Sequence, residues 1–153
     1  DNILTATIGA DTIYTRIIDE RFPDYQSVIP TDNEKEIKVS CKNLLSAVKR
    51  VSIFSNKSTH QIAIRVESGS ATVTTEDPEK ASKAQETIEI DYAGDPIDVG
   101  YNAAYLKDIL SHMKSNEIVI KLNTPINAGL FYPTPPNDNV DVTMLLMPIR
   151  LND

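Results

Sequence analysis

Few side chains in this sequence are suited to acid–base or nucleophilic chemistry. There are two histidines, His60 in a polar turn and His112 on the flank of a predicted helix, and neither has the spacing of a nucleophile or metal motif. The single cysteine, Cys41, excludes an internal disulfide and closes a predicted strand, where we expect it to pack inward. We therefore interpret all three as structural residues and expect no enzyme, no metal and no other cofactor.

Carboxylates are frequent, but none form a recognisable catalytic pair. They gather at Asp32, Glu34 and Glu36 and again over residues 86–98, at spacings suited to solvation or to an acidic interface. Residues 37–57 carry five basic residues and no acid. The net charge of -7 by itself argues against a nucleic-acid partner, because phosphate neutralisation supplies most of the affinity for duplex DNA. The charge is nevertheless segregated along the chain.

The basic residues fall on one face of a predicted helix. At helical spacing, Lys42, Lys49 and Arg50 share one side, and the apolar residues Leu44, Ala47, Val48 and Val51 take the other. In a second predicted helix, Lys107 and Lys114 share the outer face with Asp108, opposite Leu106, Ile109, Leu110 and Met113. A solvated surface is the ordinary interpretation of one such face. The repetition of this basic face in an acidic protein makes a second interpretation equal to it: a polyanion held loosely by charge, without reading of bases.

The last run of the chain, residues 144–151, is too apolar for a loose terminus. It begins as a strand with Met144 and Leu146 on one face, until Pro148 removes a hydrogen-bond donor and ends regular pairing. Beyond it, Ile149 and Leu151 need cover. They are either ordinary core or the lining of a groove that receives another protein's apolar side chains.

The elements that must position these residues follow a repeated plan. Residues 3–19 predict two strands around a turn at Gly9, and a boundary follows near residues 31–34. A strand at 36–41, a helix to about Phe54, and strands near 61–67, 70–76 and 84–93 come next. Strands near 117–122, 128–133 and 140–147 complete a second copy.

The apolar residues suggest how the two copies align. In the strands, Ile97, Val99 and Tyr101 repeat Ile37, Val39 and Cys41 at an offset of 60 residues. After a one-residue slip, the helix residues Tyr105, Leu106 and Ile109 repeat Leu44, Leu45 and Val48. We therefore predict an α+β fold with a duplicated strand-helix-three-strand unit, in which two helices pack on antiparallel sheets.

Length and composition suggest a piece of a longer protein. The 153 residues suffice for one domain with some length left over, and the chain begins at Asp1 directly in a strand pattern. Neither a signal peptide nor an apolar run long enough to cross a membrane is visible in the sequence. Together with the single cysteine, this leads us to expect a cytoplasmic location and no membrane partner.

Four segments resemble a known family. They are residues 21–25 (RFPDY) with 28–30 (VIP), 53–56 (IFSN), 100–106 (GYNAAYL) and 147–151 (MPIRL). In this order they are similar to the beta subunit of bacterial DNA polymerase III, the beta sliding clamp. The resemblance implies three similar domains per subunit and a homodimer ring around duplex DNA. Residues 1–30 would be the last strands of the second domain, 31–34 a linker, and 35–153 the third domain.

The resemblance also implies a function without catalysis. The ring is a processivity factor that tethers the polymerase to DNA without sequence specificity. It recruits the polymerase, the clamp loader and repair proteins through one hydrophobic peptide pocket. Carried over residue by residue, that pocket would comprise Pro23, Ser27, Val28, Tyr105, Ile126, Ala128, Leu145, Leu146, Met147, Pro148, Ile149, Arg150 and Leu151. Ser27 falls where the family often has a basic residue.

The remaining surfaces follow from the same resemblance. The subunit contact would include Ile53 and Phe54, with Glu79 and Glu86 as acidic support that Lys80 and Lys83 interrupt. The DNA-facing residues would be Lys42, Lys49, Arg50, Lys107 and Lys114. The competing hypothesis is an unrelated α+β ligand-binding or enzymatic module with a site near Tyr101, Tyr105 and His112. A structure without internal duplication would favour it.

Overall fold

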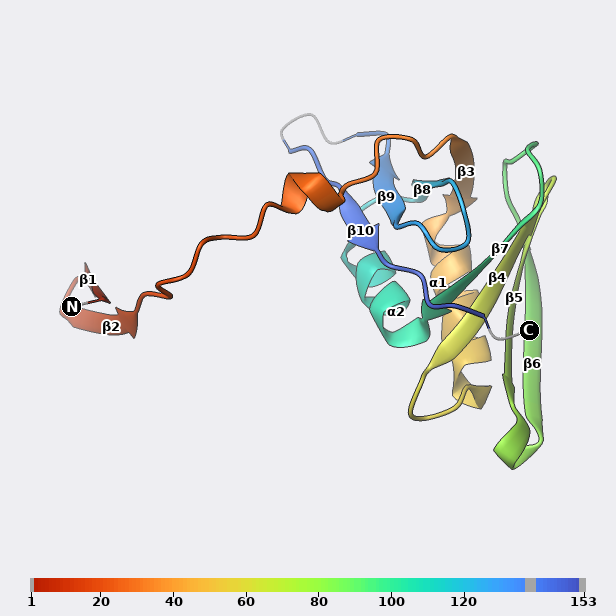
Figure 1. The fold of residues 1–153 in the computed structure, drawn as a ribbon, viewed down its shortest axis with the longest axis horizontal. Coiled ribbons are helices and arrows are strands. Elements are labelled where there is room, and N and C mark those ends of the chain that lie inside the picture. Colours follow the sequence, from red (N-terminus) through yellow and green to blue (C-terminus); the bar gives the residue numbers. More distant parts are fainter. Residues whose placement is uncertain (1, 137–139, 152–153) are drawn as a thin grey trace.

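The computed structural model describes residues 2–136 and 140–151. It opens with the predicted hairpin of β1 (Ile3–Ile8) and β2 (Asp11–Arg16), which are paired antiparallel. The turn between them holds Gly9 at a φ of 63°, which glycine adopts without steric cost. Every described residue of the hairpin is exposed, and the hairpin lies away from the remaining elements at the far left of Figure 1.

The rest of the chain confirms the predicted duplication. The first unit consists of β3 (Lys35–Ser40), α1 (Cys41–Val51), β4 (Gln61–Glu67), β5 (Ser70–Asp77) and β6 (Ser82–Glu89). The second consists of β7 (Ile97–Asn102), α2 (Ala103–His112), β8 (Glu117–Leu122), β9 (Gly129–Thr134) and β10 (Met144–Leu146). Three short 3-10 helices complete the list: η1 (Tyr25–Val28), η2 (Ser52–Phe54) and η3 (Pro78–Lys80).

Each unit contributes its first strand to the sheet of the other unit. One four-stranded sheet has the order β10-β9-β8-β3, and the other has the order β6-β5-β4-β7. β3 therefore pairs with β8 across the units and β7 pairs with β4, both antiparallel. This is the expected α+β class, with an exchange of strands that the order of elements did not reveal.

Both helices begin at a side-chain cap, and the caps correct the alignment of the repeat. The Ser40 hydroxyl accepts a hydrogen bond from the Asn43 amide, and the Asn102 side chain accepts one from the Ala104 amide at 2.9 Å. Ser40 and Asn102 are 62 residues apart, so the expected offset of 60 is wrong. Tyr101 corresponds to Val39 and not to Cys41. A strand's apolar alternation matches itself at every second residue, so apolar positions alone could not separate the two offsets.

One hydrophobic core lies between the helices and the two sheets. The predicted inner face of α1 is buried, and so are Leu106, Leu110 and Met113 of the α2 segment, while α1 and α2 pack side by side (Figure 1). Cys41 is buried as expected, although it begins α1 and does not close the strand. Its thiol lies 3.4 Å from the Leu110 carbonyl oxygen, and burial raises its pKa.

Several predicted boundaries shift by a few residues. The α-helix ends at Val51, and residues 52–54 tighten into η2. β6 spans 82–89 where 84–93 was expected, and β10 spans 144–146 where 140–147 was expected. Residues 137–139, within the proline-rich loop that follows β9, lie outside the described part of the chain.

The segment expected to be a linker is hydrogen-bonded to the β10-β9-β8-β3 sheet. The Asn33 side-chain amide donates to the carbonyl oxygens of Lys121 and Ala128, at 3.0 and 2.9 Å. The Asn123 side chain also donates to the Asp32 carboxylate. The chain is thus fixed to the β8–β9 connection two residues before β3 begins.

Candidate functional site

The C-terminal run crosses from one sheet to the other. Its first part, β10, pairs with β9 and places Leu146 opposite Gly129. Its last part leaves that sheet, because the Ile149 amide donates to the Gly100 carbonyl oxygen of β7 at 2.9 Å. The ladder with β9 thus ends before Pro148, as the missing donor predicts. The tail is neither frayed nor simply part of the core.

Some side chains of the C-terminal run are buried, as core residues would be, and others are exposed, as residues that line a groove would be. Leu146 is buried, Met144 packs against the core, and Leu145, Ile149 and Leu151 are half-buried. Met147 is 60% exposed. Arg150 is also exposed, and Pro148 is half-buried. An apolar side chain held outward on a fixed backbone is the expected feature of a contact surface.

The other predicted pocket residues of this domain lie in helix α2 and in the connection between β8 and β9. Tyr105 lies in the first turn of α2, which the Asn102 cap holds in place, and its side chain is 65% exposed. Ile126 is exposed in the β8–β9 connection, and Ala128 is buried where Asn33 fixes that connection. The role of all three residues in a pocket stays a prediction.

The residues expected on the opposite wall lie in and beside η1. Pro23, Ser27 and Val28 are all exposed. The Ser27 hydroxyl donates to the Asp24 carbonyl oxygen, and the rings of Phe22 and Tyr25 meet edge to face at 6.3 Å. These described contacts are local, so the second wall of the pocket stays a prediction.

The predicted DNA-facing cations differ in their surroundings. Lys42, Lys49 and Lys114 are exposed. The Lys107 amine lies 3.4 Å from the Ser52 hydroxyl, which in turn donates to the Lys49 carbonyl oxygen. The charge of Lys107 on α2 therefore lies beside the last turn of α1, so the two helices share a positive surface.

Arg50 is held by Glu86 on β6. The Arg50 Nε lies 2.8 Å from Glu86 Oε2, and a second guanidinium nitrogen bonds the other carboxylate oxygen. This two-point contact lowers the pKa of Glu86 and raises that of Arg50, through the hydrogen bond first and the opposite charge second. A predicted DNA-facing residue and a predicted interface residue thus neutralise each other in this chain.

The residues expected at a subunit contact lie in η2, in η3 and on β6. Ile53 is 76% exposed and Phe54 45% exposed in η2, and the Ser82 hydroxyl of β6 donates to the Phe54 carbonyl oxygen. Glu79 is exposed in η3. The two lysines that interrupt the acidic residues have partners of their own, since Lys80 pairs with buried Asp77 and Lys83 with Glu76. Their charges are therefore offset locally.

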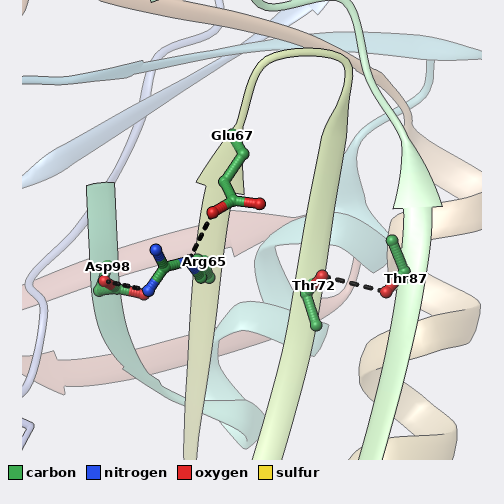
Figure 2. A network of polar contacts seen from close by, with 5 residues as sticks. All are labelled: Arg65, Glu67, Thr72, Thr87 and Asp98. Atoms are coloured by element: carbon green, nitrogen blue, oxygen red, sulfur yellow. Dashed lines mark hydrogen bonds and ion pairs between the residues drawn. The ribbon is translucent and has the colours of Figure 1, made fainter. Parts of the chain in front are cut away.

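The solvent face of the β6-β5-β4-β7 sheet is polar and paired. Figure 2 shows Arg65 of β4 between Glu67 and Asp98, with contacts of 2.7 and 3.4 Å, and the hydroxyls of Thr72 and Thr87 3.0 Å apart. The carboxylates surround the Arg65 guanidinium and raise its pKa, chiefly through the hydrogen bond to Glu67. This face offers an anion less attraction than the exposed lysines of the helices do.

The residues first considered for chemistry do not converge. His60 is exposed in a turn, and His112 lies 2.8 Å from the Asp108 carbonyl oxygen in its own helix. In residues 2–136 and 140–151, no cluster of three or more His, Cys, Asp or Glu side chains is placed to hold a metal. Over the same ranges, no helix is both long and apolar enough to cross a membrane.

One residue that contacts the tail, Gly100, was not among the predicted site residues. Gly100 lies within β7 and receives the hydrogen bond from Ile149. A glycine inside a strand pattern marks a close approach of another backbone, and that signal was present between Val99 and Tyr101.

Comparison with known families gives one match that covers most of the chain. A profile of the DNA polymerase III beta subunit, C-terminal domain, matches residues 26–150. The beta sliding clamp of Caulobacter vibrioides is 34% identical over 145 residues, which are 94% of this chain and 37% of the relative. That of Proteus mirabilis is 30% identical over 127 residues, 83% of this chain and 34% of the relative. The chain thus spans little more than a third of these relatives.

Solved structures agree with the sequence matches. A DNA polymerase sliding clamp from Pseudomonas aeruginosa, solved with a ligand, superposes with a TM-score of 0.89 at 27% identity, covering 98% of this chain and 40% of that one. A sliding clamp from Bartonella birtlesii bound to griselimycin superposes with a TM-score of 0.88 at 29% identity, covering 98% and 39%.

The contact between Arg50 and Glu86 predicts a pH-dependent contribution to stability. Because the folded pKa of Glu86 lies below its unfolded value, the contribution is present above the unfolded pKa and is lost as the pH falls through the folded pKa. Thermal unfolding of wild type and Glu86→Gln should therefore differ at neutral pH and coincide in strong acid. Glu89→Gln, an exposed acid on the same strand, is the control. A difference that persists in acid would contradict the assignment.

Proposed function

Because this chain belongs to the DNA polymerase III beta subunit family, we propose that it is the C-terminal part of a sliding clamp, a non-catalytic processivity factor of the cytoplasm. Two copies of the full-length protein close into a ring around duplex DNA. The ring tethers the polymerase and recruits it, the clamp loader and repair proteins. Residues 1–30 belong to the second domain, 31–34 link, and 35–153 form the third.

The observation that carries this proposal is the tail held across two sheets with Met147 outward. Backbone pairing at Leu146 and Ile149 fixes the run, and the exposed Tyr105 adds an aromatic surface on a capped helix. Because the backbone of the run is already fixed by this pairing, binding a peptide requires no further ordering of the backbone, and the flexible Met147 side chain can adapt to the ligand. Val28 and Pro23 complete the pocket from the η1 side.

The competing idea of an unrelated ligand-binding or enzymatic module finds no support. The fold is duplicated, and the three residues proposed for its site do not meet around one cavity. Tyr101 is buried against Phe131, while Tyr105 and His112 are exposed at opposite ends of α2.

Peptide binding tests the pocket directly. A fluorescent peptide rich in Gln, Leu and Phe should bind the full-length protein, and griselimycin, which binds the relative from Bartonella birtlesii, should compete with it. Met147→Ala should weaken binding by about tenfold, because truncating an apolar anchor at the centre of an interface carries such a cost. Val140→Ala, equally exposed but outside the pocket, should have no effect. No binding by wild type would sink the proposal.

The positive surface of the two helices predicts weak, salt-sensitive DNA binding. Lysines that neutralise phosphates without contacting bases allow a ring to slide, so affinity should fall steeply with salt and not depend on sequence. Lys49→Glu with Lys107→Glu in the full-length protein should weaken binding and lower the salt slope, by about 0.9 per lost phosphate contact. Arg65→Glu on the outer face of the β6-β5-β4-β7 sheet, where Glu67 and Asp98 already offset the charge, is the control, with no expected change. Sequence preference, or equal loss in the control, would contradict the assignment.

In the proposed ring, closure depends on the exposed apolar pair Ile53 and Phe54 beside the edge strand β6. β6 is the last strand of its sheet and leaves one row of backbone groups unpaired by the described strands, next to Ile53 and Phe54. Replacing both side chains with serine in the full-length protein should convert a dimer into a monomer, as measured by sedimentation. Val140→Ser controls for the loss of an exposed apolar side chain. A dimer that persists in the double variant would place the contact elsewhere.

A further inference from the structure

Two short backbone bridges join the two sheets, one from each repeated unit. Lys38 of β3 bridges Asp91, which follows β6, and Gly100 of β7 bridges Ile149, which follows β10. Lys38 lies two residues before the cap Ser40, and Gly100 lies two residues before the cap Asn102. The C-terminal tail is therefore the repeat equivalent of the segment after β6. Each bridge joins a strand of one sheet to the segment that follows the edge strand of the other sheet.

The two bridges differ in their backbone hydrogen bonds and in the residue on the strand. Lys38 and Asp91 exchange two backbone hydrogen bonds, of 3.0 and 2.8 Å, and Lys38 carries a side chain that pairs with Glu117. A β-carbon is thus compatible with this kind of bridge. At the tail, the described bridge has the single bond from the Ile149 amide to the Gly100 carbonyl oxygen.

A side chain at position 100 has no room. A β-carbon built there would lie 2.5 Å from the Ile149 carbonyl oxygen and 2.8 Å from Leu151 Cδ2. The first neighbour is backbone, which a rotamer change cannot move away. Gly100 does not lie in the left-handed region, so glycine is needed here for space and not for its backbone freedom.

We propose that Gly100 is the positioning residue of the peptide pocket: by lacking a side chain it lets residues 149–151 dock on β7 and so sets the place of Met147 and Arg150. This inference rests on the proposed function. Gly100 itself does not contact the peptide. It acts through the tail, whose described pairing with β9 ends at Leu146, opposite Gly129, and is followed by one further bridge, of Ile149 to Gly100. These two positions are the anchors on either side of Met147.

Gly129, the partner of Leu146, is also crowded, but by core side chains and not by the tail itself. A β-carbon on Gly129 would lie 2.5 Å from the hydroxyl of Tyr101, the residue that follows Gly100. Met147 and Pro148 span the gap between the two anchors. A shift at either anchor therefore moves the exposed side chain between them, while the helices and the rest of both sheets keep their pairing.

The test compares Gly100→Ala with Lys38→Ala in the full-length protein. Gly100→Ala should weaken binding of the Gln-, Leu- and Phe-rich peptide and of griselimycin by about tenfold or more, since overpacking a close contact displaces the neighbouring backbone. Lys38→Ala, the equivalent position of the other bridge, should bind both ligands as wild type does. Equal binding by Gly100→Ala and wild type would overturn the proposal.

Two measurements without peptide distinguish a failure of the role proposed for Gly100 from a failure of the proposed function. In wild type the Ile149 amide should be protected from hydrogen exchange, and in Gly100→Ala it should exchange rapidly. Gly100→Ala should also lower the melting temperature of the full-length chain but not that of a variant ending after Pro148, in which nothing remains to clash. An equal loss in both backgrounds, or an unprotected Ile149 amide, overturns the role of Gly100. Wild type that docks its tail but binds neither ligand overturns the proposed function instead.

Discussion

The pairing of β3 with β8 and of β7 with β4 is the constraint on which the rest of this domain depends. Each sheet contains three consecutive strands from one unit and one strand from the other. Neither unit can complete its sheet alone, so the two helices that follow the exchanged strands are brought side by side. The caps at Ser40 and Asn102 then fix where each strand becomes a helix. Strand exchange, more than helix packing, sets the position of the basic surface.

The helices and the outer sheet face of the domain have different surface chemistry. The helices expose Lys42, Lys49 and Lys114, while the outer sheet face holds its cation Arg65 between Glu67 and Asp98. An acidic protein can thus carry a local attraction for phosphate without a net positive charge. The bond between Arg50 and Glu86 marks the border between these two surfaces.

The sequence predicted the order of the elements, but it did not predict how the two repeated units align with each other. Helical and strand periodicities predicted the order of elements and the buried face of α1, because both arise from the spacing of apolar residues. The offset of the repeat was missed by two residues, since the caps and not the apolar residues distinguish it. The fastening of residues 31–34 was also missed, because the partners of Asn33 are backbone atoms of Lys121 and Ala128. Likewise, no pattern revealed that Arg50 would pair with Glu86, 36 positions away.

The docking of Ile149 on Gly100 has a consequence for synthesis. A ribosome makes the chain from its N-terminus, and β3 must wait for β8 before its sheet can form, a pairing of high contact order. The tail follows all of these strands along the chain, and its bridge to Gly100 adds no strand to either sheet. A chain that stops short of Ile149 therefore contains every strand of both sheets and lacks only this bridge. The outward position of Met147 can thus be lost separately from the fold.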